Sequence, residues 1–259
     1  MRQMSATTQL LASFAMTAAA VAAAFALPVA AHATTISIFG GDDPKVVGSG
    51  HMVNQQRKLG NFTTLRIDGP VDVEAHPGAN PGVTVHTDDN IEPLIETAVE
   101  GDALVVRFRQ GTSFRTSQKV YVEVIFATLN AARQQGSGDL HITALNSPKF
   151  DSSIAGSGDL RMDEAQVGSF AVGIAGSGDV TLSGHADEAR FSIAGSGDIR
   201  AAKFAARKVS VSISGSGDAH VNATDSLDAR VAGSGDVLYA GHPHDVTRHV
   251  AGSGSVKAD

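Results

Sequence analysis

The chain has 259 residues, of which 42% are apolar and 18% charged, with 28 glycines and no cysteine. This apolar content excludes a disordered chain, and the formal charge of −7 gives no general electrostatic reason to bind nucleic acid. The absence of cysteine excludes disulfide scaffolds, thiol catalysis, cysteine zinc sites and iron–sulfur clusters.

The N-terminal 33 residues resemble an export signal. Arg2 is the only charge, an Ala-rich apolar run extends from Leu10 to Leu27, and Ala31-His32-Ala33 has the small-x-small pattern of a cleavage site. A retained membrane anchor is the alternative, but alanine contributes little insertion energy. We therefore expect residues 1–33 to be a cleaved signal peptide, and no later segment is apolar enough to cross a bilayer. This predicts an exported protein of the periplasm, the cell surface or the exterior of a Gram-negative bacterium.

Residues 34–56 are predicted to be a leader or linker that is only partly ordered. They contain Gly40-Gly41-Asp42-Asp43-Pro44 and a Gly48-Ser49-Gly50 that no Asp follows. One domain is expected from residue 57 to 259, with an irregular N-terminal half over 57–135 and regular repeats over 136–259.

Alternating apolar residues predict several strands in the irregular half. Prolines and glycines separate these runs as turns, and residues 90–99 could hold one helical turn. The apolar runs are Phe62, Leu65 and Ile67; Val71 and Val73; Val83 and Val85; Leu104 to Phe108; and Val120 to Phe126.

The C-terminal half repeats a Gly-Ser-Gly motif at intervals of about 20 residues. The first glycines of the copies are Gly136, Gly156, Gly176, Gly195, Gly215, Gly233 and Gly252. In all but the last copy the next residue is an aspartate, namely Asp139, Asp159, Asp179, Asp198, Asp218 and Asp236. Ser255 takes this place in the last copy. Because the glycines are periodic, they do not form a flexible linker.

Apolar residues keep step with the motif and alternate within each repeat. Ile154, Ile174 and Ile193, for example, each stand two positions before a Gly-Ser-Gly. Alternation indicates strands with one buried face, and a short repeat cannot bury that face without a stacked neighbour. The Leu-x-x-Leu-x-Leu pattern of leucine-rich repeats is absent. The sequence therefore predicts an all-β parallel β-helix, or β-solenoid, with one coil for each repeat.

These features resemble the bacterial head GIN domain, a family described as an autotransporter adhesin head. The resemblance covers residues 57–256 and rests on Asn61 to Ile67, Pro70 to Val73, Gly101 to Val106 and the Gly-Ser-Gly-Asp copies. It implies a right-handed β-helix, export and an adhesin-like role, with no established catalytic residues.

The motif residues suggest how each corner is built. Both glycines are expected on the inward side, where a residue without Cβ permits positive φ and a close approach to the core. Stacked aspartates would repel one another by about 1 kcal/mol per pair near water. We expect each aspartate to accept backbone N–H groups at its own corner, with the outward column that contains Arg161 and Arg200 neutralising the charge.

Two other functions, calcium binding and polysaccharide cleavage, would also use the aspartate column. A calcium ladder would use the Asp side chains and glycine carbonyls, but the spacing differs from that of known nine-residue calcium repeats. A polysaccharide-acting enzyme could use Asp159, Asp179 and Asp198 with Arg161 and Arg200. Glycosidic cleavage needs two carboxyl groups in different environments, whereas a uniform ladder gives them similar ones. The cluster of His242, His244 and His249 is interpreted as surface histidines rather than a metal site.

The sequence therefore predicts a non-enzymatic module for surface interaction, adhesion or envelope scaffolding, with no cofactor. Its expected partner is an envelope protein or a glycan bound on the outward Asp and Arg column, and nucleic acid is not expected. Unpaired sheet edges at the ends of the stack would permit end-to-end self-association.

Overall fold

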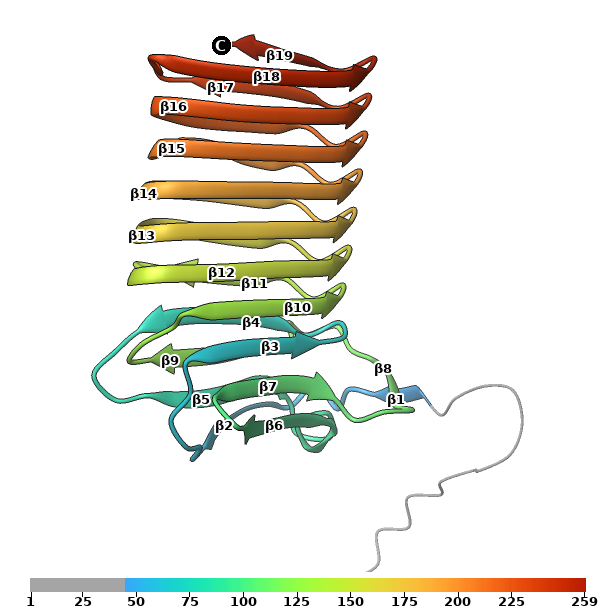
Figure 1. Cartoon of the computed structure of the whole chain (residues 1–259). Helices are drawn as coiled ribbons and strands as arrows, with labels where there is room; N and C mark the ends of the chain where they lie inside the picture. The colour runs from blue at the N-terminus through green and yellow to red at the C-terminus, as the bar shows by residue number, and fades with distance from the viewer. Residues whose placement is uncertain (1–44) are drawn as a thin grey trace, which may run out of the picture. The chain divides into compact units, whose positions relative to one another are not determined.

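Parallel strands stacked in coils form most of the computed structural model, which describes residues 45–259 (Figure 1). The predicted signal peptide and residues 34–44 of the predicted leader lie outside the described residues. Across residues 45–259, no helix is long and apolar enough to span a membrane.

The strands divide into an irregular N-terminal group and a regular C-terminal group. The first group comprises β1 (Lys45–Val47), β2 (Met52–Arg57), β3 (Thr64–Asp68), β4 (Asp72–Pro77), β5 (Gly82–Asp88), β6 (Ile95–Glu100), β7 (Ala103–Phe108), β8 (Ser113–Arg115) and β9 (Tyr121–Phe126). The second comprises β10 (Ala131–Gly136), β11 (Leu140–Thr143), β12 (Asn146–Gly156), β13 (Leu160–Gly176), β14 (Val180–Gly195), β15 (Ile199–Gly215), β16 (Ala219–Gly233), β17 (Asp236–Ala240), β18 (Asp245–Gly252) and β19 (Ser255–Ala258).

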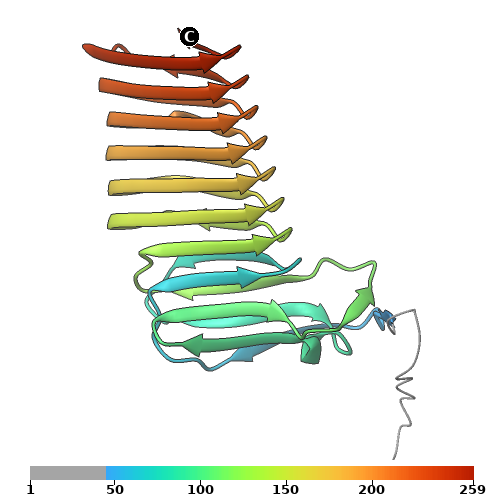
Figure 2. The same cartoon turned by 45° about the vertical axis from the view of Figure 1, so that its right-hand side comes forward.

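The regular coils pair like residue with like. Ile154 lies beside Ile174, which lies beside Ile193, and Gly156, Gly176 and Gly195 stack in the same register. The tight corners follow the arrowheads on one side of every coil (Figure 2). The prediction of a β-solenoid is confirmed, with about six turns.

The core of the regular coils is a column of aliphatic side chains around a phenylalanine cluster. Phe170 lies in the middle of this cluster, with ring centroids 6.1 Å from Phe150, 6.1 Å from Phe191 and 5.1 Å from Phe204. All four rings are at most 1% exposed. Because each coil contributes only a thin layer, burial of these rings requires neighbouring coils to be in place.

The order of coils in the N-terminal half differs from their order along the chain. Strands β3 and β4 lie between the β7–β9 pair on one side and the β10–β11 pair on the other. The chain therefore forms the β3–β4 coil first and then the β7–β9 coil, on the side away from the regular repeats. It then crosses back to the other side of the β3–β4 coil, where β10 begins the regular repeats. The predicted apolar runs form β3, β4, β5, β7 and β9, as expected.

Antiparallel strands cover the N-terminal end of the stack. Strand β6 pairs with β7, and β5 pairs with both β9 and β2. One expectation is corrected here and another is confirmed. Strands β1 and β2 lie in the predicted leader, so at least residues 52–56 belong to the folded domain. The predicted helical turn is a short 3₁₀ helix at Glu92–Leu94, and most of the remaining segment forms β6.

The last coil departs from the repeat at its C-terminal end. Arg248 occupies the column of buried Ala229, stacks on the ring of Tyr239 and donates a hydrogen bond to its hydroxyl. Ser255 replaces the motif aspartate in the same coil. The last described coil therefore carries polar side chains at two positions where the preceding coils have a buried alanine and a carboxylate.

Candidate functional site

Two glycines shape each corner in different ways. The first glycine has a positive φ, from +121° at Gly136 to +143° at Gly176 and Gly195. The second has no positive φ and is buried in every copy but the last, and a Cβ on Gly178 would overlap the carbonyl oxygen of Gly158. The expectation of positive φ at Gly178 is therefore wrong. The first glycine alone makes the bend, and neither glycine leaves room for a Cβ, since one on Gly176 would overlap the carbonyl oxygen of Gly156.

The motif aspartates form a ladder along this corner. The Oδ1 atom of each aspartate accepts a hydrogen bond from the backbone N–H of the corresponding residue in the following coil, rather than at its own corner as we expected. The N···O distances are 2.9 Å from Asp159 to Asp139, 2.8 Å from Asp179 to Asp159, 2.9 Å from Asp198 to Asp179, 3.0 Å from Asp218 to Asp198, and 2.7 Å from Asp236 to Asp218. These bonds tie successive coils together and offset the repulsion between neighbouring carboxylates.

The ladder begins one coil earlier than the repeat indicates. The N–H of Asp139 donates to Oδ1 of Asp72 at 3.0 Å. Asp72 follows Gly69-Pro70-Val71, and Gly69 has a φ of +102° like the motif glycines. In the sequence, this corner shares with the repeats only a glycine three residues before an aspartate. Pro70 and Val71 stand where the repeats have Ser-Gly, so the motif is not recognisable here.

At the other end, Ser255 terminates the ladder. Its N–H and its hydroxyl both donate to Oδ1 of Asp236, at 2.7 and 2.8 Å. The Ser255 hydroxyl, followed by its N–H, lowers the pKa of Asp236. Because serine has no carboxylate, it offers no equivalent acceptor to a following coil.

Arg200 neutralises the middle of the ladder. Its guanidinium lies 2.7 Å from Asp179 and 3.1 Å from Asp198. Burial opposes ionisation of Asp179, but the N–H of Asp198 and the Arg200 guanidinium outweigh burial and hold the pKa of Asp179 below its usual value. The hydrogen bond to Asp179 in turn raises the pKa of Arg200.

The other residues of the predicted basic column contact different partners. Arg161 lies 2.7 Å from Asp163, and His141 lies 2.8 Å from the same carboxylate. His220 pairs with Asp259 at 3.0 Å. The expectation that Arg161 neutralises the ladder is thus wrong. Within residues 45–259, Asp139, Asp159, Asp218 and Asp236 have no ion pair.

Two hollows lie along the ladder, one on each side of Arg200. One has a volume of about 430 Å³ and the other about 330 Å³. The larger is lined by Asp198, Arg200, Asp218, His220, Asp236, Leu238, Ser255 and Lys257, among others. The smaller includes Asp139, His141, Asp159, Arg161, Asp179 and Arg200. The ladder face therefore offers carboxylate acceptors beside cationic donors, at intervals of one coil or about 4.8 Å.

The family model described as "Putative auto-transporter adhesin, head GIN domain" matches residues 61–243. The chain belongs to this family. The match covers the ladder from Asp72 to Asp236, and an adhesin-like family is consistent with an exported or surface protein.

Solved structures similar to this chain include a "putative adhesin" from Bacteroides fragilis, 27% identical with a TM-score of 0.77, where the match covers 83% of this chain and 100% of that one. A "putative lipid binding protein" from Parabacteroides distasonis is 26% identical with a TM-score of 0.68, covering 83% and 99%. A search of curated proteins finds no match.

The head GIN ladder suits binding better than acid–base catalysis. Asp159, Asp179 and Asp198 share one task, since each accepts an N–H from the following coil. The pKa values of Asp179 and Asp236 both lie below the usual value of an aspartate. Glycoside hydrolysis needs one carboxyl group with a raised pKa to donate a proton. Among residues 45–259, no group of three or more His, Asp or Glu side chains is placed to hold a metal ion.

Proposed function

We propose that this protein is an exported, non-enzymatic adhesion module that binds an extended polysaccharide of the cell envelope or its surroundings along the ladder face. The observation that carries the proposal is the row of carboxylates, each with one oxygen committed to the fold, beside Arg200, His220 and Lys257. Arg200 occupies the second oxygen of Asp179 and of Asp198, while Asp139, Asp159, Asp218 and Asp236 have no ion pair within residues 45–259. Membership of an adhesin-like family supports it.

The chemistry of the face matches a polymer rich in hydroxyl groups. A carboxylate oxygen accepts hydroxyl hydrogen bonds, while guanidinium and ammonium groups donate to hydroxyl and ring oxygens. A rigid ladder with one carboxylate per coil favours a ligand whose own repeat is of similar length, because successive sugars then meet equivalent acceptors. Rigid placement also lowers the entropy cost of binding.

A glycan array with the purified protein tests the proposal. The variant Asp218→Asn with Asp236→Asn retains an Oδ1 acceptor for the following coil but removes both charges. We expect polysaccharide binding to weaken about tenfold or more, since each lost charged hydrogen bond costs about 1.5 kcal/mol or more. The matched control is Glu188→Gln, an exposed carboxylate paired with Lys208 outside the ladder. Equal binding by the ladder variant and the control would contradict the proposal.

Thermal unfolding in EDTA and in millimolar calcium separates this proposal from a calcium-loaded module. Since one oxygen of each ladder carboxylate serves the next coil, we expect the melting temperature to be the same in both. A large rise with calcium would replace polysaccharide binding with calcium binding as the role of the ladder. Release of shortened glycan products would instead indicate the enzyme.

A further inference from the structure

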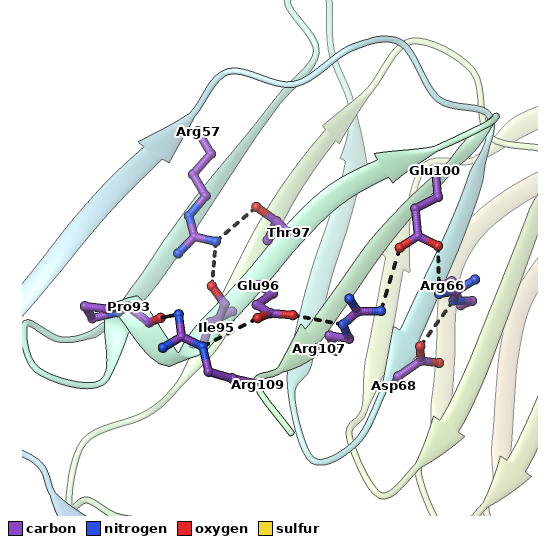
Figure 3. A network of polar contacts seen from close by, with 10 residues as sticks. All are labelled: Arg57, Arg66, Asp68, Pro93, Ile95, Glu96, Thr97, Glu100, Arg107 and Arg109. Carbon is purple, nitrogen blue, oxygen red and sulfur yellow. Dashed lines mark hydrogen bonds and ion pairs between the residues drawn. The ribbon is translucent and has the colours of Figure 1, made fainter. Parts of the chain in front are cut away.

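Three arginines surround a separate hollow in the N-terminal half (Figure 3). Its volume is about 430 Å³. Arg57 comes from β2, while Arg107 from β7 and Arg109 just beyond it point toward Glu96 on β6. The lining residues are Arg57, Pro93, Ile95, Glu96, Thr97, Ala98, Val105, Arg107 and Arg109.

Arg57 is held in place by the protein. Its guanidinium donates to the carbonyl of Ile95 at 2.6 Å and to the hydroxyl of Thr97 at 3.1 Å. It also pairs with Glu92 at 2.5 Å, and its side chain is 19% exposed. Arg57 therefore fixes one wall of the hollow, and Glu92 balances its charge.

Arg107 and Arg109 share a single carboxylate. Arg107 donates from Nε to Glu96 at 3.0 Å, and Nε of Arg109 lies 3.5 Å from the same group. The hydrogen bond from Arg107 leads the influences that lower the pKa of Glu96, so this group is ionised. Glu96 is the one acidic residue in the lining, against three guanidinium groups.

Some donors at this site have no acceptor in the described part of the chain. Arg107 also pairs with Glu100 through Nη1 at 3.7 Å, and Arg109 donates from Nη2 to the carbonyl of Pro93 at 3.2 Å. Within residues 45–259, Nη2 of Arg107 and Nη1 of Arg109 have neither a hydrogen bond nor an ion pair. The protein thus leaves a donor without a partner on each of the two arginines that flank Glu96.

The hollow also has an apolar wall. Val105 and Ile95 line it while being only 2% exposed, and Pro93 and Ala98 add aliphatic surface. These apolar atoms cover one side of the hollow, while the side chains of Arg107 and Arg109 stay open to solvent. This environment differs from that of the ladder, where the unpaired groups are carboxylates.

We propose that this hollow is an anion site that binds one oxyanion group, a phosphate, sulfate or carboxylate, through Arg107 and Arg109, with Arg57 as a fixed wall. Guanidinium groups bind such oxygens with bidentate geometry. The site goes beyond the proposed polysaccharide function, since none of its lining residues belongs to the ladder.

The primary test is titration of the purified protein with inorganic phosphate, sulfate and acetate, followed by NMR of the arginine Nε–Hε signals. We expect saturable shifts at Arg107 and Arg109, with Arg200 unchanged as an internal control. Arg109→Gln should weaken binding about tenfold, because it removes a charged hydrogen bond from an exposed side chain. Absence of saturable shifts with all three anions would overturn the proposal.

Glu96→Gln gives the sharper test because its expected effect has the opposite sign. Removing the one acidic group of the lining should tighten anion binding several-fold, since a competing carboxylate and its repulsion are lost. The matched control is Glu188→Gln, which removes an equally simple surface ion pair elsewhere and should change nothing. Weaker or unchanged binding in Glu96→Gln would contradict an anion site and indicate a purely structural ion-pair network.

The source of the anion is examined with two larger probes. Vesicles of anionic phospholipid and a soluble sulfated polysaccharide are compared for the wild type and Arg109→Gln, with zwitterionic vesicles as the control. Binding that depends on Arg109 to either probe identifies that source. If only the small anions bind in this way, the site is one for free anions, and the proposal still stands. Loss of polysaccharide binding in the ladder variant alone would leave this site intact, so the two proposals fail independently.

Discussion

The regular coils and the N-terminal half place different residues at equivalent corners. Gly138 lies in register above Val71, and a Cβ on Gly138 would overlap the carbonyl oxygen of Val71. Val71 itself is buried with its full side chain, because the chain on its other side takes a wide path from residue 109 to 120 instead of a tight corner. Whether a corner position requires glycine or accepts a larger side chain thus depends on how closely the neighbouring coil approaches it.

The two regions also differ in how polar groups link their layers. In the regular coils, one aspartate contact recurs from Asp72 to Ser255. In the N-terminal half, individual ion pairs such as Arg57–Glu92 and Arg66–Glu100 join residues more than 30 positions apart. Each contact between regular coils is therefore repeated in the neighbouring coils, whereas each ion pair of the N-terminal half occurs once.

The largest expected effect tests the requirement for glycine in the regular coils. Gly178→Val should destabilise the fold by more than about 4 kcal/mol, because its side chain would overlap the backbone of Gly158. Gly173→Val, in strand β13 just before this corner, is the control, since nothing lies within 4 Å of a Cβ there. Urea unfolding measures both. Equal stability of the two variants would disprove close approach as the reason for the second glycine.

The next effect concerns the core. Phe170→Ala should cost about 3–5 kcal/mol, since its ring contacts three other buried phenylalanines. Phe62→Ala in the N-terminal half should cost less, because Phe62 is 8% exposed and lies at the edge of the core. The same unfolding measurements rank the two variants, and a larger cost at Phe62 would contradict the central position of the cluster.

The sequence predicted the regular region better than the irregular one, for physical reasons. Period and alternation specify which residues stack, so the buried Ile154 and Ile174 column could be foreseen. Periodicity does not say whether a carboxylate bonds within its own coil or to the next, so the direction of the ladder was missed. The contacts of Arg57 with Glu92 and Ile95 depend on how β2 packs beside β5 and β6, which no local pattern reveals.

The ladder contact is expected to have a moderate effect. Asp179→Ala should cost about 1–2 kcal/mol, because the N–H of Asp198 loses its acceptor and Arg200 loses a partner. Asp179→Asn should cost less, since the amide oxygen can still accept from Asp198. Thermal unfolding of both variants separates the hydrogen bond from the charge. An asparagine variant as unstable as the alanine one would show that the charge dominates.

The pH dependence follows from the same residue. The lowered pKa of Asp179 in the folded state means that ionised Asp179 stabilises the fold above the unfolded pKa of about 3.9. This contribution is lost as pH falls from there through the folded pKa, because the unfolded state then binds the proton first. Stability measured from pH 6 to 3 should therefore fall less steeply in Asp179→Asn than in the wild type. Parallel profiles would contradict this assignment.

The smallest expected effect is at the end of the ladder, where Ser255→Asp restores the repeat residue. An aspartate would keep its N–H bond to Asp236 but lose the hydroxyl donor, and it would place a second negative charge beside a carboxylate that Ser255 now stabilises. In the interior this repulsion is offset because each carboxylate receives an N–H from the following coil. The described chain has no coil after Ser255, so we expect a small loss of stability that diminishes with added salt. A stabilising Ser255→Asp would mean that the ladder depends on its own charges rather than on the N–H groups between coils.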